Sequence, residues 1–160
     1  MIGLMMAAAL ATGAVTAQPW QRYGNAHYGY STCYPPKAFR PQGESDAGDG
    51  QSFKAADGAE IRAWGGYAVD GTPSAQFADE MKQLSADLSG KTGKVTYRVD
   101  RPGWTVFSGR SGSTIFWVKG MRQGDRIVTV QFTYPAARMA AYQAIPGTLN
   151  RCSSIGTAAF

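Results

Sequence analysis

The second half of the chain alternates apolar and polar side chains over four successive segments separated by very short turns. The four segments are residues 94–101, 104–109, 113–122 and 126–134. Alternation with a period of two indicates β-strands that bury one face. Turns of two or three residues can join only antiparallel neighbours. We therefore expect an antiparallel meander of four strands, with one buried and one more polar face.

The first half of the chain predicts three further strands and a loop. The strands are expected at residues 28–34, 51–55 and 60–67. The pair Asp57-Gly58 between the last two is a strong hairpin turn. Residues 41–50 contain three acids and three glycines, and this composition indicates a surface loop.

A helix is predicted between the two groups of strands. Thr72 can cap its first turn, Pro73 fits that turn, and Gly90 suits its end. Its apolar side chains recur at helical spacing and form one stripe, made of Phe77, Met81, Leu84 and Leu88.

A second helix is predicted to begin at Pro135 and to be kinked or split at Pro146-Gly147. The order of elements is then three strands, a helix, four strands and a helix. Helices over one face of an antiparallel sheet of six to seven strands give an α+β fold. We expect one α+β domain over residues 18–160.

Residues 1–17 predict a signal peptide. They carry no charge, are almost wholly apolar or small, and end in Val15-Thr16-Ala17, which suits signal-peptidase cleavage. No Lys or Arg precedes the apolar run, which is also shorter than the roughly 20 apolar residues that a spanning helix needs. We expect a periplasmic or secreted protein without a transmembrane segment after signal removal. A retained anchor is the alternative.

The only two cysteines, Cys33 and Cys152, lie near opposite ends of the chain. An even pair in an oxidising compartment indicates a disulfide, here between the first strand and the end of the last helix. Two separate buried thiols are the alternative. Two cysteines and the single His27 cannot supply a four-ligand structural zinc site. We expect neither a metal nor a cofactor.

The net charge of +5 comes from one segment, residues 90–126, with eight basic residues against two acids. Outward basic side chains on the meander would form a surface for an anionic envelope component or an acidic protein. The candidate binding residues on this sheet face are Lys94, Arg98, Arg110, Lys119 and Arg122. The alternative is a solvated face that protects the sheet from edge pairing. Nucleic acid is a poor partner for an exported protein.

Three aromatic residues of the same segment, Tyr97, Trp104 and Trp117, could contribute contacts, although aromatics at strand spacing more often lie in a core.

No segment carries a catalytic or nucleotide-binding motif. Gly90-Lys91-Thr92 lacks the preceding glycine of a P-loop and follows a predicted helix, where that motif follows a strand. The serines near Gly109 lack the spacing of a nucleophile elbow. The acids of residues 41–50 do not match the spacing of an EF-hand loop, so a solvated turn is favoured over a weak calcium site.

The order of elements resembles the PsbP-like fold, which photosynthetic extrinsic proteins share with bacterial envelope proteins of the DcrB type. Local segments are also similar to small secreted bacterial proteins of uncharacterised function. The matching segments are Tyr28-Gly29-Tyr30, Cys33-Tyr34-Pro35, Gly48-Asp49-Gly50 with Phe53, Ala56-Asp57-Gly58-Ala59, Val95-Thr96-Tyr97-Arg98 and Tyr134-Pro135. The resemblance implies a non-enzymatic binding or accessory role in the envelope and supplies no catalytic residues.

The sequence thus predicts an exported envelope binding or accessory protein that is not an enzyme. Two alternatives remain open: a small envelope hydrolase whose site is assembled only in the fold, and an inhibitor or immunity-type protein. A protruding loop such as residues 41–50 would suit the inhibitor.

Overall fold

The computed structural model describes residues 19–156, and the signal peptide expected over residues 1–17 lies outside this range. The first five strands are β1 (Gln21–Asn25), β2 (Tyr30–Tyr34), β3 (Arg40–Glu44), β4 (Gly50–Lys54) and β5 (Glu60–Tyr67). The other five are β6 (Lys94–Arg101), β7 (Trp104–Ser111), β8 (Thr114–Gln123), β9 (Arg126–Pro135) and β10 (Ser154–Ile155). The helices are α1 (Pro73–Ser89), α2 (Met139–Tyr142) and α3 (Ile145–Cys152), with a 3-10 turn, η1 (Ala136–Arg138), before α2.

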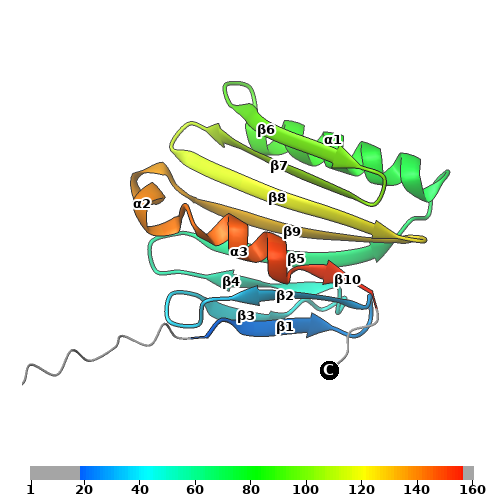
Figure 1. Ribbon diagram of the computed structural model, residues 1–160, viewed down its shortest axis with the longest axis horizontal. Coiled ribbons are helices and arrows are strands. Elements are labelled where there is room, and N and C mark those ends of the chain that lie inside the picture. The colour runs from blue at the N-terminus through cyan, green and yellow to red at the C-terminus, as the bar shows by residue number, and fades with distance from the viewer. Residues whose placement is uncertain (1–18, 157–160) are drawn as a thin grey trace, which may run out of the picture.

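The strands form two antiparallel sheets (Figure 1). The large sheet has seven strands in the order β3-β4-β5-β9-β8-β7-β6, and the small sheet has the order β1-β2-β10. The strands β6 to β9 follow one another as the predicted meander. The α+β architecture and the seven-stranded sheet are therefore confirmed.

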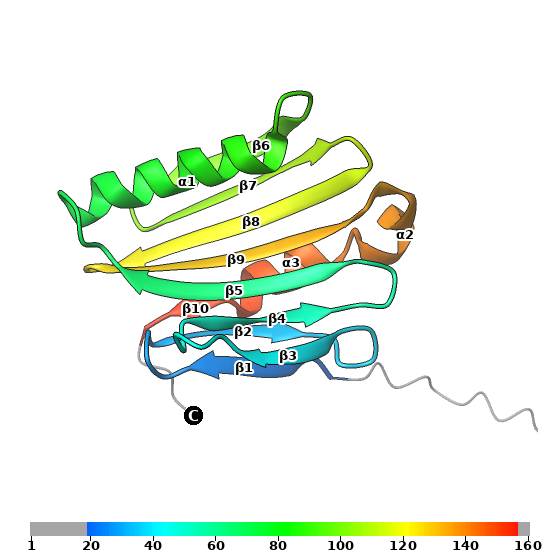
Figure 2. The same cartoon turned by 180° about the vertical axis from the view of Figure 1, so that it is seen from behind.

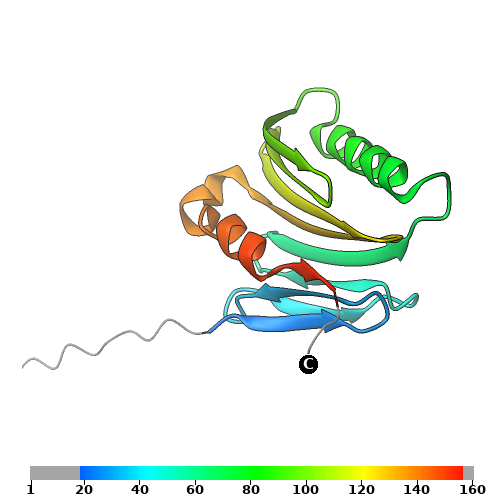
Figure 3. The ribbon, with the colours of Figure 1, turned by 45° about the vertical axis from the view of Figure 1, so that its right-hand side comes forward.

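Helices cover both faces of the large sheet, whereas the sequence predicted helices over one face. Helix α1 crosses the β6–β8 side of one face, which we call the α1 face (Figure 2). Helices α2 and α3 lie on the opposite face, the α3 face, and the small sheet lies beside them against β4 and β5 (Figure 3). The difference arises because the meander buries apolar side chains on both faces: Phe107 and Val118 under α1, Trp117 and Phe132 on the other side.

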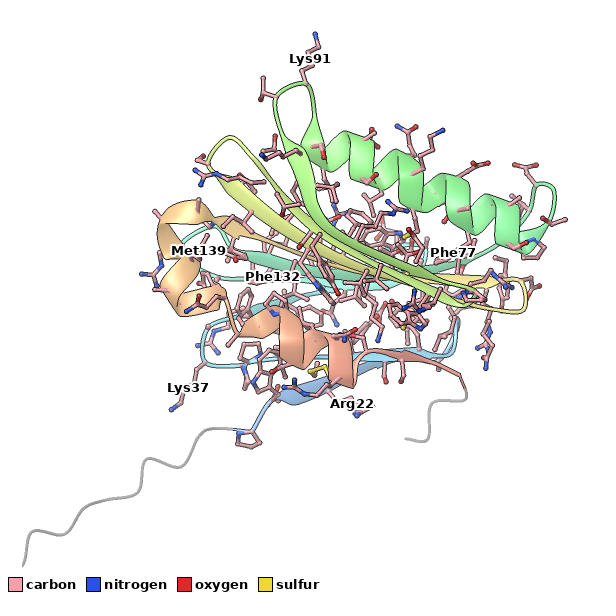
Figure 4. The ribbon with its side chains drawn as sticks, turned by 45° about the horizontal axis from the view of Figure 1, so that its top comes forward. Arg22, Lys37, Phe77, Lys91, Phe132 and Met139 are labelled. Atoms are coloured by element: carbon pink, nitrogen blue, oxygen red, sulfur yellow. A yellow bond between two sulfur atoms is a disulfide. The ribbon has the colours of Figure 1, made fainter. Side chains whose placement is uncertain are left out.

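Helix α1 begins and ends as its sequence predicts. The backbone N–H of Ala75 donates to Thr72 Oγ1 at 3.3 Å, and Gly90 ends the helix with a φ of 58°. Phe77 lies between the helix and the sheet (Figure 4), and Met81 packs directly on Gly120. A Cβ atom at Gly120 would overlap Met81 Sδ, so glycine at this position sets how closely the helix approaches the sheet.

The disulfide joins Cys33 of β2 to Cys152 at the end of α3, with a Cα–Cα distance of 6.0 Å (Figure 4). The predicted link between an early strand and the last helix is confirmed. Next to it, β10 pairs with β2, and Thr32 and Ser153 share a hydrogen bond of 2.8 Å between their hydroxyls. The predicted break in the last helix is also present, because α2 and α3 are separate and Pro146 lies in the first turn of α3.

The prediction of a surface loop over residues 41–50 is wrong in its first half, where β3 forms an edge strand paired with β4. All five β3 residues are exposed and the register shifts between Pro41 and Glu44, so the strand has no alternating pattern to detect. Strand β1, residues 21–25, was also not predicted. It pairs with β2 over all five of its residues.

Candidate functional site

The five predicted binding residues do not share one face of the sheet. Strand register places Lys94, Arg110 and Lys119 on the α3 face, and Arg98 and Arg122 on the α1 face. The cause is a β-bulge in β6: Val95 pairs with Gly109 and Tyr97 with Ser108, which leaves Thr96 unpaired. One extra residue reverses the face of every later side chain in the strand.

The two arginines on the α1 face are held by the protein itself. Arg98 Nε lies 2.9 Å from Asp100 Oδ2, and its guanidinium stands 5.5 Å from the centre of the Phe107 ring. This contact contributes to holding the pKa of Asp100 below its ordinary value. Arg122 donates to the carbonyls of Gly124 at 2.9 Å and Pro102 at 3.4 Å, so it fastens two adjacent turns.

Lys119 is also structural. Its ammonium donates to the backbone carbonyls of Asn150 at 2.7 Å and Ser153 at 3.0 Å, at the C-terminal end of α3. A cation at this end complements the helix dipole and satisfies carbonyls that have no partner within the helix. Burial lowers the pKa of Lys119.

Three exposed cations of β6 and β7 lie on the open half of the α3 face, Lys94 and Arg110 at one end of the two strands and Arg101 at the other. Together with the two exposed aromatic residues of this face they form what we call the basic aromatic surface: Lys94, Tyr97, Arg101, Trp104 and Arg110. Tyr97 is 55% exposed and Trp104 is 39% exposed, whereas Trp117 is buried. Two of the three aromatic candidates are therefore accessible.

The basic aromatic surface has no acidic neighbour on its own face. Register places no Asp or Glu on the α3 face of β6 to β9. From Arg101 to the end, the chain contains seven basic residues and one acid, Asp125. Arg101 and Arg110 donate within their own turns, to the carbonyls of Asp100 and Gly112 at 2.9 and 2.7 Å. Their positive charges thus face solvent unneutralised.

A hollow of about 370 Å³ adjoins this surface at Trp104. Lys119 and Met121 line it from the sheet, and Asn150 and Ser153 line it from the end of α3. Trp104 therefore belongs to the basic aromatic surface and also lines this hollow. Arg101 and this hollow were not among the predicted site features, because both depend on the bulge and on where α3 ends.

The α1 face carries a second hollowed region, beside the helix. Two cavities of about 440 Å³ each adjoin at Trp64, which lines both. One extends over β4 and the edge strand β3, and the other runs between α1 and strands β5 and β9. Sequence reasoning missed Trp64 entirely; its only signal was an aromatic residue followed by two glycines.

The remaining polar clusters hold elements together. Tyr23 donates to Glu44 Oε1 at 2.6 Å, which ties β1 to β3, and burial raises the pKa of Tyr23 to about 12. Asp57 accepts from Tyr142 at 2.6 Å and from Arg138 at 2.9 Å, which ties the β4–β5 turn to α2. Among residues 19–156 no group of three His, Cys, Asp or Glu side chains could hold a metal ion.

Comparison with known proteins identifies the architecture. No family model and no curated protein matches the sequence. Among solved structures, cyanobacterial PsbP (CyanoP) from Synechocystis sp. PCC 6803 is similar, with a TM-score of 0.60 and 12% identity, over 93% of this chain and 98% of that one. The chain has the PsbP-like fold. Identity this low shows the fold alone, so any function has to be argued from the surfaces described above.

The disulfide fits a protein of an oxidising, non-cytoplasmic compartment, because such bonds form and persist there. No helix within residues 19–156 is both long and apolar enough to cross a membrane.

Proposed function

We propose that this protein is an exported, non-catalytic binding module of the cell envelope, periplasmic or secreted. Its basic aromatic surface binds phosphate groups of an anionic envelope component. One observation carries the proposal: Lys94, Arg101 and Arg110 stand with Tyr97 and Trp104 on a sheet face that has no acidic side chain over β6 to β9.

Export is supported by two independent features. The uncharged apolar run of residues 1–17 has the composition of a signal peptide. The disulfide between Cys33 and Cys152 belongs in an oxidising compartment. An envelope location would bring the basic aromatic surface into contact with phosphate-bearing lipids and polymers.

The chemistry of the surface favours phosphate. Arginine presents a planar fork of donors that matches two phosphate oxygens, and Arg101 and Arg110 commit only part of that fork to their own turns. Tyr and Trp place an apolar ring and a polar tip at a boundary between water and lipid. Tyr97 and Trp104 would then support binding to a headgroup layer.

Vesicle binding of the oxidised protein tests the proposal. We expect sedimentation with phosphatidylglycerol vesicles and none with phosphatidylcholine vesicles. A triple variant, Lys94→Glu with Arg101→Glu and Arg110→Glu, should weaken binding by about 100-fold or more, since each basic residue near an anionic membrane contributes about 1 kcal/mol. If soluble poly(glycerol phosphate) competes with the vesicles for the protein, the phosphate source is a polymer. If it does not compete, the phosphate source is a lipid.

A matched control separates the surface from net charge. Lys37→Glu with Arg40→Glu and Lys82→Glu changes the charge equally at exposed positions away from β6 and β7. This control should lose far less affinity. Equal losses in both triple variants, or no binding to either phosphate probe, would contradict the proposal and favour an acidic protein partner. Arg98, Lys119 and Arg122 are unsuitable for such a test, because their contacts hold turns and α3 in place.

A further inference from the structure

The groove between α1 and the open half of the α1 face has features of a ligand site. Trp64 lies where its two cavities adjoin, and Figure 2 shows that α1 leaves β9 and β5 uncovered on this side. The Arg62 guanidinium stands 5.5 Å from the centre of the Trp64 ring. This cation–π contact helps to fix the orientation of the indole, so the groove has a rigid aromatic platform.

Gly66 keeps the groove open. It lies two residues beyond Trp64 and pairs with Ile127, so its missing side chain would project from the α1 face into the groove. A Cβ atom there would have no atom within 4 Å, and its φ is not in the left-handed region. Neither packing nor backbone conformation requires glycine, which weakens a strand by roughly 0.5–1 kcal/mol. Such a glycine marks a place where a ligand approaches the backbone.

Thr129 supplies a hydroxyl group next to Trp64. The residue is only 2% exposed, lies beside Trp64 in register, and lines the same cavity. A hydroxyl both donates and accepts hydrogen bonds, so it can pair with a polar group of a ligand in the cavity.

The rest of the lining selects the class of ligand. Glu80 and Asp87 stand on the α1 side and oppose an anion such as a fatty acid. Each carboxylate accepts from a glutamine four residues earlier in the helix, at 2.7 and 2.8 Å, and keeps further acceptor capacity. Beyond Trp64, the second cavity is lined by amides, hydroxyls and charges of both signs, among them Arg62 and Asp49. This lining disfavours an anion and favours a ligand rich in hydroxyl groups, which can pair with carboxylates, amides and guanidinium alike.

We infer that this groove binds a neutral saccharide chain stacked on Trp64. The C–H face of a sugar ring would pack on the indole, as apolar groups do on aromatic side chains. Its hydroxyls would donate to the carboxylates of Glu80 and Asp87 and bond with Thr129. Because the cavities adjoin at Trp64, the chain would continue from one to the other. This site lies on the opposite face of the sheet from the basic aromatic surface and stands independently of the function proposed above.

NMR titration of the isotopically labelled, oxidised protein tests the inference. The probes are tetrasaccharides of β-1,4-linked N-acetylglucosamine, α-1,4-linked glucose and β-1,3-linked glucose, with decanoate and tetramethylammonium as other occupants. We expect at least one tetrasaccharide to shift the Trp64 indole and the Gly66 and Thr129 amide resonances, with saturation. The inference is overturned if no tetrasaccharide moves them, or if only decanoate or tetramethylammonium does.

Variants sharpen the test. Trp64→Ala should weaken saccharide binding at least ten-fold, and Gly66→Leu should abolish it by filling the groove while the spectrum stays that of a folded protein. Thr129→Val, which keeps the side-chain shape, covers the case in which Gly66→Leu fails to fold, and it should weaken binding several-fold. Trp104→Ala is the matched control on the other face and should leave saccharide affinity unchanged. Wild-type affinity in both Gly66→Leu and Thr129→Val would refute the site.

Discussion

Removal of the disulfide is the perturbation whose magnitude follows most directly from the structure. Cys33 and Cys152 are separated by 119 positions, and the chain-entropy relation gives about 4.9 kcal/mol for a loop of this length. Domains of ordinary size have a free energy of unfolding of about 5–15 kcal/mol, so the bridge provides a large share. The variant Cys33→Ala with Cys152→Ala should still fold, because β10 still pairs with β2 and the hydroxyls of Thr32 and Ser153 still meet.

Urea unfolding measures the effect. With an m-value of about 2 kcal/mol/M, the midpoint of the double variant should fall by about 2.5 M relative to the oxidised protein. Wild type reduced with a phosphine should show the same shift. Amide exchange should rise first at Ser153, whose N–H donates to Leu149 at 3.0 Å, next to the lost bond. A midpoint change below about 0.5 M, at an unchanged m-value, would refute the entropy argument.

Three further outcomes are expected from urea unfolding. Gly120→Val should cost about 1–3 kcal/mol, because its side chain has to displace Met81; a loss within error would show that α1 is free to shift. Burial raises the pKa of Tyr23 to about 12, so the unfolded chain loses this proton at a lower pH than the folded protein does. The free energy of unfolding should therefore fall as the pH rises above 10. Tyr23→Phe should make this fall with pH less steep. The hydrogen bond from Tyr142 holds the pKa of Asp57 below its ordinary value of 3.8. The contribution of the Asp57 carboxylate to the free energy of unfolding should therefore be lost as the pH falls below 3.8. Asp57→Asn should reduce this loss of stability in acid.

The elements predicted correctly from sequence are those specified by local patterns. The meander strands alternate, and α1 has a cap at Thr72, a terminator at Gly90 and an apolar stripe that includes Met81. The disulfide was predicted from a count of two cysteines and from the signal peptide expected over residues 1–17. Strand β3 was missed because an exposed edge strand with Pro41 has neither alternation nor apolar content, and only its pairing with β4 defines it.

The candidate site was less predictable, because its composition depends on a single unpaired residue. Strict alternation put Val95 and Val99 on one face, but the bulge at Thr96 separates them. Arg98 was thereby moved to the α1 face and Arg101 to the α3 face. The cavity beside Trp64 is lined on one side by α1, which follows Trp64 in sequence. That helix packs on strands that come later still in the chain. A short segment of sequence around Trp64 therefore gives no sign of the cavity.

The closure of β2 by β10 and Cys152 also dictates the order of biogenesis. During synthesis Cys33 emerges more than a hundred residues before its partner, so β2 first exists with a free thiol and one unpaired edge. Because β10 directly follows α3, the small sheet and the disulfide are both completed by the last part of the described chain. With two cysteines in the sequence a single intramolecular pairing is possible, so formation of the correct bond needs an oxidant but no disulfide isomerase.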